Sequence, residues 1–318
     1  MIMFSYEPRM LSLSMIWEGA RHNAFTDLAC HGGRWYCAFR EGAGHALSVG
    51  RIRVLVSEDG LKWESAALIA LRGVDLRDPK LSRAADGNLE LLMGASPIRE
   101  GRYTGRSTLA SRSPDGSSWS PPSPVVGEGD WLWRVARRGK KSYGISYRLP
   151  SPRRWIVALL RSDDGLTYRE FAQLGVPGKP NEATLRFRGP EAEAIALVRR
   201  EAGNSRAWIG RSLPPYIDWS WCEAAERVGG PNFIVLPGGS LVAATRILRR
   251  GKPLVALCSM TEDSLTPILT LPSGGDCGYP GMVFHRDRLW MSYYSSHEGK
   301  ARIYLATIDL AGLSPGSA

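Results

Sequence analysis

Short segments rich in β-forming residues recur along the whole chain, and no long segment has the 3.6-residue period of an amphipathic helix. Six of these segments, most of them opened by a Gly or Asp turn, are Gly33–Arg40, Gly87–Met93, Lys141–Arg148, Ala194–Arg199, Gly239–Arg246 and Asp287–Tyr294. Another short strand precedes each of them by one turn. Hairpins at this regular spacing predict an all-β protein made of six similar sheets.

A turn motif repeats with the strands. The pattern Ser-x-Asp-Gly-x-x-aromatic occupies Ser57–Trp63, Ser113–Trp119 and Ser162–Tyr168, about fifty residues apart. In such a turn the Asp carboxylate accepts backbone N–H groups, the Gly adopts a positive φ, and the aromatic ring packs under the hairpin. Weaker echoes near Arg211–Ser212 and Cys258–Ser259 keep the period. The repeat predicts the blades of a β-propeller.

The two ends of the chain predict how the ring of blades closes. The last clear strand, Ala301–Ala306, takes the third place in its blade, and Gly, Ser and Pro follow it. Near the start, Leu11–Trp17 is a strand without a hairpin partner. Pairing the first strand with the last hides two sheet edges. We therefore predict one domain over residues 1–318: a six-bladed β-propeller of four-stranded antiparallel blades, closed by the N-terminal strand.

Composition supports this class and excludes others. The 318 residues include 35 Gly, 21 Pro and 11 Trp, which suits many short strands and tight turns. The five cysteines contain no CxxC pair, so neither a disulfide framework nor a zinc site is indicated, and no metal or cofactor is predicted. The net charge is +10, yet no basic run or binding motif indicates nucleic acid. Glu7 and Pro8 interrupt any leader, and no run could span a membrane, so a cytoplasmic location is expected.

The innermost strand of each blade opens with polar residues. Blade by blade, these openings contain Asp27, Arg77-Asp78, Arg134, Glu182, Asn232 and Tyr279. They could be ordinary polar residues at strand starts. Because innermost strands converge on the axis of a propeller, the alternative is that they line one central polar pocket, and we favour the pocket.

The Ser-x-Asp-Gly-x-x-Trp repeats resemble the Asp boxes of the sialidase (neuraminidase) superfamily, and the resemblance covers nearly the whole chain. It implies a glycoside hydrolase with a Tyr nucleophile activated by a Glu, an Asp acid/base, and arginines that hold a substrate carboxylate. Asn181-Glu182 resembles the segment with the activating Glu, and Tyr279 resembles the nucleophile. Arg199 or Arg200, together with Arg246, resembles the carboxylate-binding arginines.

The chain also departs from that family. Its Arg-Ile-Pro motif is missing from the first blade, which has Phe25–Leu28 instead, and Gly44-His45-Ala46 stands where the acid/base Asp is expected. His45 can donate a proton near neutral pH. Leu76–Lys80 resembles the Arg-Asp-Pro segment of invertase-type fructosidases, in which that Asp stabilises the transition state. This likeness supports Asp78 as a pocket carboxylate.

The leading hypothesis is a glycoside hydrolase of the exo-α-sialidase type that acts on an acidic sugar, with no nucleic-acid or membrane partner. Its predicted catalytic residues are Tyr279, Glu182 and Asp78. Its predicted substrate-binding residues are Arg40, Arg77, Arg134, Arg200, Arg246, Asp27, His45 and Asn232. Three alternatives remain open: a carbohydrate-binding propeller without catalysis, a glycosidase of another sugar that uses Asp78 and Glu182, and an interaction platform without a small ligand.

Overall fold

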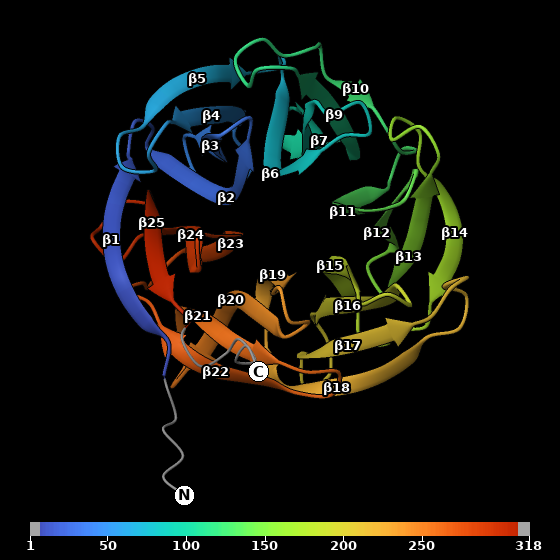
Figure 1. Ribbon diagram of the computed structural model, residues 1–318. Coiled ribbons are helices and arrows are strands. Elements are labelled where there is room, and N and C mark those ends of the chain that lie inside the picture. The colour runs from blue at the N-terminus through green and yellow to red at the C-terminus, as the bar shows by residue number, and fades with distance from the viewer. Residues whose placement is uncertain (1–6, 311–318) are drawn as a thin grey trace, which may run out of the picture.

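The computed structural model describes residues 7–310, which form six antiparallel sheets around a central axis (Figure 1). The first blade contains β2 (His22–His31), β3 (Arg34–Gly42), β4 (Arg51–Ser57) and β5 (Glu64–Ile69). The second contains β6 (Val74–Arg83), β7 (Leu89–Arg99), β9 (Ser107–Ser113) and β10 (Ser123–Pro124), with β8 (Arg102–Tyr103) paired to β7. The third contains β11 (Trp131–Arg138), β12 (Lys141–Ser151), β13 (Arg154–Ser162) and β14 (Arg169–Leu174).

The remaining blades repeat this order from the axis outward. The fourth contains β15 (Pro180–Arg188), β16 (Glu193–Arg200), β17 (Arg206–Ser212) and β18 (Ser220–Arg227). The fifth contains β19 (Gly229–Val235), β20 (Leu241–Arg249), β21 (Lys252–Met260) and β22 (Leu265–Thr270). The sixth contains β23 (Cys277–His285), β24 (Arg288–Ser295), β25 (Arg302–Asp309) and β1 (Arg9–Trp17). The prediction of six four-stranded blades is confirmed.

The predicted closure is also confirmed. β1 pairs antiparallel with β25 and is the outermost strand of the sixth blade, in the order β1-β25-β24-β23. The Ser12 and Thr307 hydroxyls lie 2.5 Å apart across this pair, and Leu13 packs against the apolar core between the fifth and sixth blades. The first six residues, which belong to the segment used to predict the absence of a leader, lie outside the described residues. No helix among the described residues is long and apolar enough to cross a bilayer.

The Ser-x-Asp-Gly turns join the third and fourth strands of their blades. In the first, Asp59 Oδ1 accepts the backbone N–H groups of Leu61 at 2.8 Å and Lys62 at 3.0 Å. Ser57 Oγ accepts the N–H of Gly60 at 2.8 Å. Backbone donors hold the pKa of the exposed Asp59 carboxyl below its usual value. Asp115 and Asp164 accept the corresponding bonds in the other two turns.

The turn glycines have a role that the repeat did not reveal. A Cβ added to Gly60 would lie 2.5 Å from the Trp290 ring, and one added to Gly116 would lie 2.0 Å from the Tyr36 ring. The Tyr36 hydroxyl also donates to the Asp115 carbonyl at 2.8 Å. Each of these two turns therefore packs against an aromatic side chain of the preceding blade. A glycine is required there because a larger residue would collide with that ring.

Bulges near the starts of the innermost strands determine where the functional side chains lie. In five of these strands, two residues stand opposite one on the neighbouring strand. These bulges comprise Phe25-Thr26, Asp78-Pro79, Asn181-Glu182, Gly230-Pro231 and Tyr279-Pro280. Asp78 and Tyr279 have φ values of 50° and 52°. Because a bulge re-aims a side chain, the repeated bulge brings residues from distant parts of the sequence together at one end of the axis.

Candidate active site on the propeller axis

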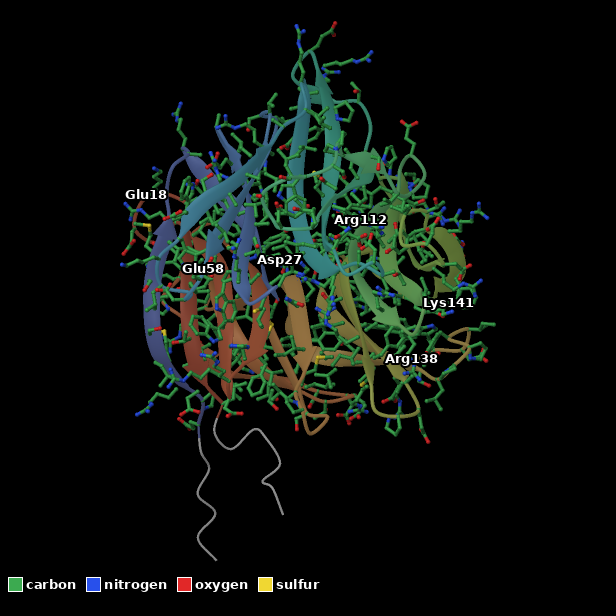
Figure 2. The ribbon with its side chains drawn as sticks, turned by 45° about the horizontal axis from the view of Figure 1, so that its top comes forward. Glu18, Asp27, Glu58, Arg112, Arg138 and Lys141 are labelled. Carbon is green, nitrogen blue, oxygen red and sulfur yellow. The ribbon has the colours of Figure 1, made fainter. Side chains whose placement is uncertain are left out.

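A cavity of about 350 Å³ opens at the end of the axis where the innermost strands begin. Every blade except the fifth contributes to it. Its lining residues are His45, Arg77, Asp78, Ser96, Tyr103, Gly105, Arg106, Trp131, Tyr147, Glu182 and Tyr279. The β7–β8 hairpin, in teal, projects from this face of the molecule (Figure 2). The structure thus brings together all three predicted catalytic residues, along with Arg77 and His45.

Tyr279 and Glu182 form the closest polar pair of the cavity. The Tyr279 hydroxyl donates a hydrogen bond to Glu182 Oε1 at 2.5 Å, although the two residues are far apart in sequence. Arg199 Nη1 donates to Glu182 Oε2 at 2.8 Å and reaches the Tyr279 hydroxyl oxygen at 3.3 Å. The backbone N–H of Gly230 donates to Glu182 Oε2 at 2.7 Å. The carboxylate is therefore fixed beside the phenol.

The charges of this pair follow from burial and from Arg199. Burial alone would raise the pKa of Glu182, but Arg199 and the hydrogen bonds to the carboxylate outweigh it, so the net shift is downward. Burial, followed by the Glu182 charge, raises the pKa of Tyr279 well above its usual value, despite Arg199 and Arg246. In the resting site, an ionised Glu182 therefore accepts a hydrogen bond from a neutral Tyr279.

Asp78 is a second carboxyl group in the cavity, with a different environment. Burial raises its pKa, and the opposing effects of Arg77 and Lys80 are smaller. The Arg77 Nε atom is 4.0 Å from Asp78 Oδ2, too far for a hydrogen bond. The cavity thus holds one carboxyl group whose pKa is lowered and one whose pKa is raised, an arrangement typical of acid/base sites.

Arginine and aromatic side chains form the remaining wall. Arg106 lies over the rings of Trp131 and Tyr147, at 4.8 Å and 4.6 Å from their centroids. Among the described residues, no carboxylate forms an ion pair with Arg106, and its buried Nε has no hydrogen-bond partner. Arg77 lies 4.8 Å over the Phe25 ring. Arg106 in particular has no internal carboxylate to neutralise it, so an anionic ligand could do so.

His45 enters the rim of the cavity from the loop between β3 and β4. Its Nδ1 atom is hydrogen-bonded to Asp276 Oδ2 at 2.8 Å, and half of its side chain is exposed. His22 Nε2 lies 2.8 Å from the same oxygen, and the Tyr294 hydroxyl donates to Asp276 Oδ1 at 2.7 Å. Burial raises the pKa of Asp276, but these hydrogen bonds outweigh it and hold the pKa far below its usual value.

Within residues 7–310, only one group of three His, Cys, Asp or Glu side chains has donor atoms close enough together for a metal ion. It is this same group, His22, His45 and Asp276, with donor atoms within 4.8 Å of one another. In the structure the three side chains bond to each other through Asp276 Oδ2. We therefore describe them as a hydrogen-bonded cluster.

Arg40 does not face the cavity, contrary to the prediction. It is fully buried, and its Nε donates to Asp75 Oδ1 at 2.7 Å. Its other nitrogens donate to the carbonyls of Gly44 and Ser48, at 2.7 Å and 3.0 Å. Arg40 thus supports the loop that carries His45. The prediction erred because a buried carboxylate from the second blade pairs with this arginine.

Asp27, Arg134 and Asn232 also lie away from the cavity lining, so the predictions that placed them there are wrong. Arg134 donates to both oxygens of Asp27, at 2.8 Å and 2.9 Å, in a buried pair that ties the first blade to the third. Asp27 lies in the interior of the molecule in Figure 2. Asn232 donates to the Pro280 carbonyl at 3.0 Å, which links the fifth and sixth blades. These residues follow the bulges and connect innermost strands.

The predicted arginines of the fourth and fifth blades, Arg200 and Arg246, lie in different places relative to the cavity. Arg200 turns toward Glu223 and the Trp208 ring, away from the cavity, so its predicted place is wrong. Arg199 occupies the place beside Tyr279 instead. Arg246 is not among the cavity-lining residues; it lies next to Tyr279 and donates to the Cys277 carbonyl at 3.3 Å.

Arg199 was one of the two alternatives, Arg199 or Arg200, and it is the one that lies beside Tyr279. Several other residues of the site were missed. Asp276 directly precedes an innermost strand, and a polar residue at that point of a blade is a signal for a place near the cavity. Arg106 and Tyr147 follow no motif, since they reach the cavity only through the geometry of the second and third blades.

Comparisons with known proteins bear on the fold. No family model matches the chain, and no curated protein matches its sequence. A protein of unknown function from Dyadobacter fermentans is similar in structure, with a TM-score of 0.80 and 20% identity over 95% of this chain and 99% of that one. A Penicillium chrysogenum α-L-arabinanase complexed with arabinobiose has a TM-score of 0.72 and 12% identity, covering 96% and 99% of the two chains.

A sialidase of Trypanosoma rangeli in complex with sialic acid is also similar, with a TM-score of 0.66 and 14% identity. The match covers 97% of this chain but only 58% of the sialidase. At these identities the comparisons establish the shared six-bladed fold, which this chain has in common with glycoside hydrolases of different specificity.

Proposed function

We propose that the protein is a glycoside hydrolase of the sialidase type that cleaves the glycosidic bond of an acidic sugar. The observation that carries the proposal is the 2.5 Å hydrogen bond from the Tyr279 hydroxyl to Glu182 in an open axial cavity. A nucleophile within hydrogen-bond reach of a base that a third group orients is the arrangement expected for covalent catalysis. Here Arg199 is the orienting group.

The pair can carry out the displacement step as follows. Tyr279 Oη attacks the anomeric carbon while its proton passes to Glu182 Oε1, because the neutral phenol is a weak nucleophile. The charge of Arg199 then stabilises the oxygen that is losing its proton. Glu182 is placed to accept that proton, since it is ionised and already accepts the hydrogen bond of the phenol.

The acidic character of the substrate is inferred from the basic side of the cavity. Arg77 and Arg106 line it: Arg77 lies 3.9 Å from Asp75 Oδ2 and 4.0 Å from Asp78 Oδ2, whereas among the described residues no carboxylate forms an ion pair with Arg106. Stacking of Arg106 on Trp131 and Tyr147 fixes the plane of its guanidinium group in advance. A sugar carboxylate would supply the missing charge, and the solved relatives that contain sialic acid or arabinobiose agree with a carbohydrate ligand.

A panel of fluorogenic aryl glycosides tests the proposal. The panel contains a sialoside, glucuronides of both anomers and a neutral arabinofuranoside. We expect turnover of an acidic member and a loss of at least about a thousandfold in kcat for Tyr279→Phe, with ligand binding retained. Tyr168→Phe is the matched control, because that buried tyrosine lies away from the cavity, in the third Ser-x-Asp-Gly turn. Turnover of no acidic member would contradict the proposal.

One observation favours a second candidate, a glycosidase that uses Asp78 and Glu182 as its acid and base. The pKa values of the two carboxyl groups are shifted in opposite directions within one cavity. In that case Tyr279→Phe would keep most of its activity, whereas Asp78→Asn and Glu182→Gln would each lose it.

A further inference from the structure

We propose that His45, held by Asp276, is the group that protonates the leaving oxygen and later activates water. This inference rests on the proposed function, because it assigns the proton-transfer step of the same cavity. The displacement by Tyr279 needs a second proton carrier, since Glu182 is occupied with the phenol proton. The carrier must lie at the rim of the cavity, where the leaving group departs.

The imidazole of His45 lies at the rim of the cavity and is held there by a carboxylate. It lines the cavity with half of its side chain exposed, and its Nδ1 is fixed on Asp276 Oδ2 at 2.8 Å. A carboxylate can only accept a hydrogen bond, so Nδ1 carries the proton. Nε2 has no hydrogen-bond partner among the described residues and is free to give or take the mobile proton.

Asp276 is held for this positioning role. Its Oδ1 accepts the Tyr294 hydroxyl at 2.7 Å, and its backbone N–H donates to Ser296 Oγ at 2.8 Å. His22 shares Oδ2, and its side chain is only 12% exposed. A carboxylate that remains ionised in this setting both orients the His45 ring and stabilises its protonated form.

The loop that carries His45 is fixed as well. The carbonyls of Gly44 and Ser48 accept bonds from the buried Arg40, and the carbonyl of His45 accepts Arg77 Nη2 at 3.0 Å. The Tyr103 hydroxyl accepts the backbone N–H of Leu47 at 2.8 Å. A half-exposed histidine on a surface loop does not need these hydrogen bonds for the protein to fold. The support is expected if the ring must stay within reach of one substrate atom.

The reaction has two steps, formation and hydrolysis of the bond to Tyr279, and every proton is accounted for in both. In the first, the bond from the anomeric carbon to the leaving oxygen breaks, and that oxygen takes the proton from His45 Nε2. A bond to Tyr279 Oη forms, and the phenol proton moves to Glu182. In the second, water attacks the anomeric carbon and gives its proton to His45 Nε2. The bond to Tyr279 breaks, and Glu182 returns the phenol proton.

Asp78 is the competing proton donor. Its side chain is only 11% exposed, and it lies on the bulge of β6 with Arg77, Lys80, Glu182 and Asp75 as its charged neighbours. The groups facing His45 are Asp276, the rings of His22 and Phe25, and the Arg77 side chain, which bonds to its carbonyl and also neighbours Asp78. Asp78 thus lies deeper, and we expect it to contact the sugar ring.

Leaving-group dependence tests the proposal. The wild type, His45→Gln, Asp276→Asn and Asp78→Asn are compared on two glycosides of the sugar that the wild type hydrolyses. One releases 2,4-dinitrophenol, which needs no protonation, and the other releases an alkyl alcohol. For His45→Gln we expect kcat/KM to fall at least about a hundredfold on the alkyl glycoside and less than about tenfold on the dinitrophenyl one.

Asp276→Asn should show the same pattern with a smaller loss, which a merely structural role would not produce. His31→Gln, at the far end of β2, is the matched control and should have the kinetics of the wild type on both glycosides. The melting temperature of every variant should stay near that of the wild type. Equal losses on both glycosides, or the leaving-group pattern in Asp78→Asn instead, would overturn the assignment. Inactivation by a chelator with recovery on adding Zn²⁺ would make His45 a ligand and overturn it too.

Failure of the proposed function gives a different result. If the wild type hydrolyses no glycoside of either kind, both proposals fall together. An active wild type with an unchanged His45→Gln variant removes only the role of His45 and leaves Tyr279 and Glu182 in place.

Discussion

The two ends of the blades use the same residue types in opposite ways. At the Ser-x-Asp-Gly turns, Asp59, Asp115 and Asp164 are exposed, accept bonds from backbone groups one turn away, and keep lowered pKa values. At the strand openings, Glu182 is buried and is bonded to Arg199 and Tyr279 from other strands. Asp78 is largely buried beside Arg77 and Lys80 of its own strand. The hydrogen bonds of each turn Asp are complete within seven residues, whereas the pairing of Glu182 with Tyr279 exists only once the ring has closed.

This difference separates what the repeat preserves from what it leaves free. A local turn can be copied unchanged into each blade, because it satisfies its own polar groups. A strand opening faces five others across the axis, so each one can carry a different side chain on the same bulged backbone. Substitutions at the turns should therefore change stability alone, and substitutions in the cavity should change turnover alone.

Removal of β1 should have the largest effect, because it breaks the scaffold that both ends share. A chain that starts after Trp17 leaves β25 as an open edge and loses the hydrogen bond from Trp17 Nε1 to Glu41. We expect aggregation and no cooperative thermal transition by circular dichroism. A chain that starts at Glu7, just before β1, should melt as the full protein does. A soluble, cooperative truncation would refute the closure.

The buried pair of Asp27 and Arg134 gives the next largest effect. Asp27→Asn leaves the Arg134 guanidinium buried without its charge partner, which costs about 3–5 kcal/mol. Urea denaturation measures this loss, and kcat of the folded fraction should be unchanged. A variant of normal stability that fails to bind ligand would return Asp27 to the substrate site.

The turn carboxylates give the smallest effect. Asp59→Ala removes an acceptor from two backbone N–H groups that water can reach, so we expect only a small fall in the melting temperature and no change in kcat. Glu58→Ala, at the exposed neighbouring position, is the control and should not change either quantity. A loss of turnover in Asp59→Ala without loss of stability would erase the distinction between the two ends.

Much of the fold could be predicted because its signals are local. The three turns, the six hairpins and the orphan first strand each lie within a short segment, so the blade count and the closure followed from the sequence. The pairing of Tyr279 with Glu182 was also predictable, since both stand at strand openings that a propeller brings to the axis.

The arginines of the site were less predictable, because their directions depend on partners from other blades. Arg40 and Arg134 occupy positions like those of cavity residues, but Asp75 and Asp27 pair with them in the interior. Arg106 reaches the cavity beside the projecting β7–β8 hairpin, which belongs to no repeat. Non-local ion pairs and an irregular loop therefore account for the differences.

Trapping of the covalent intermediate tests the central claim most directly. A glycosyl fluoride of the sugar that is turned over, with a second fluorine beside the anomeric carbon, forms the intermediate readily but releases it slowly. Peptide mass spectrometry then locates the attached sugar. The account predicts a stoichiometric label on the peptide that contains Tyr279, and no label in Tyr279→Phe. A label on Asp78 or Glu182 would contradict it.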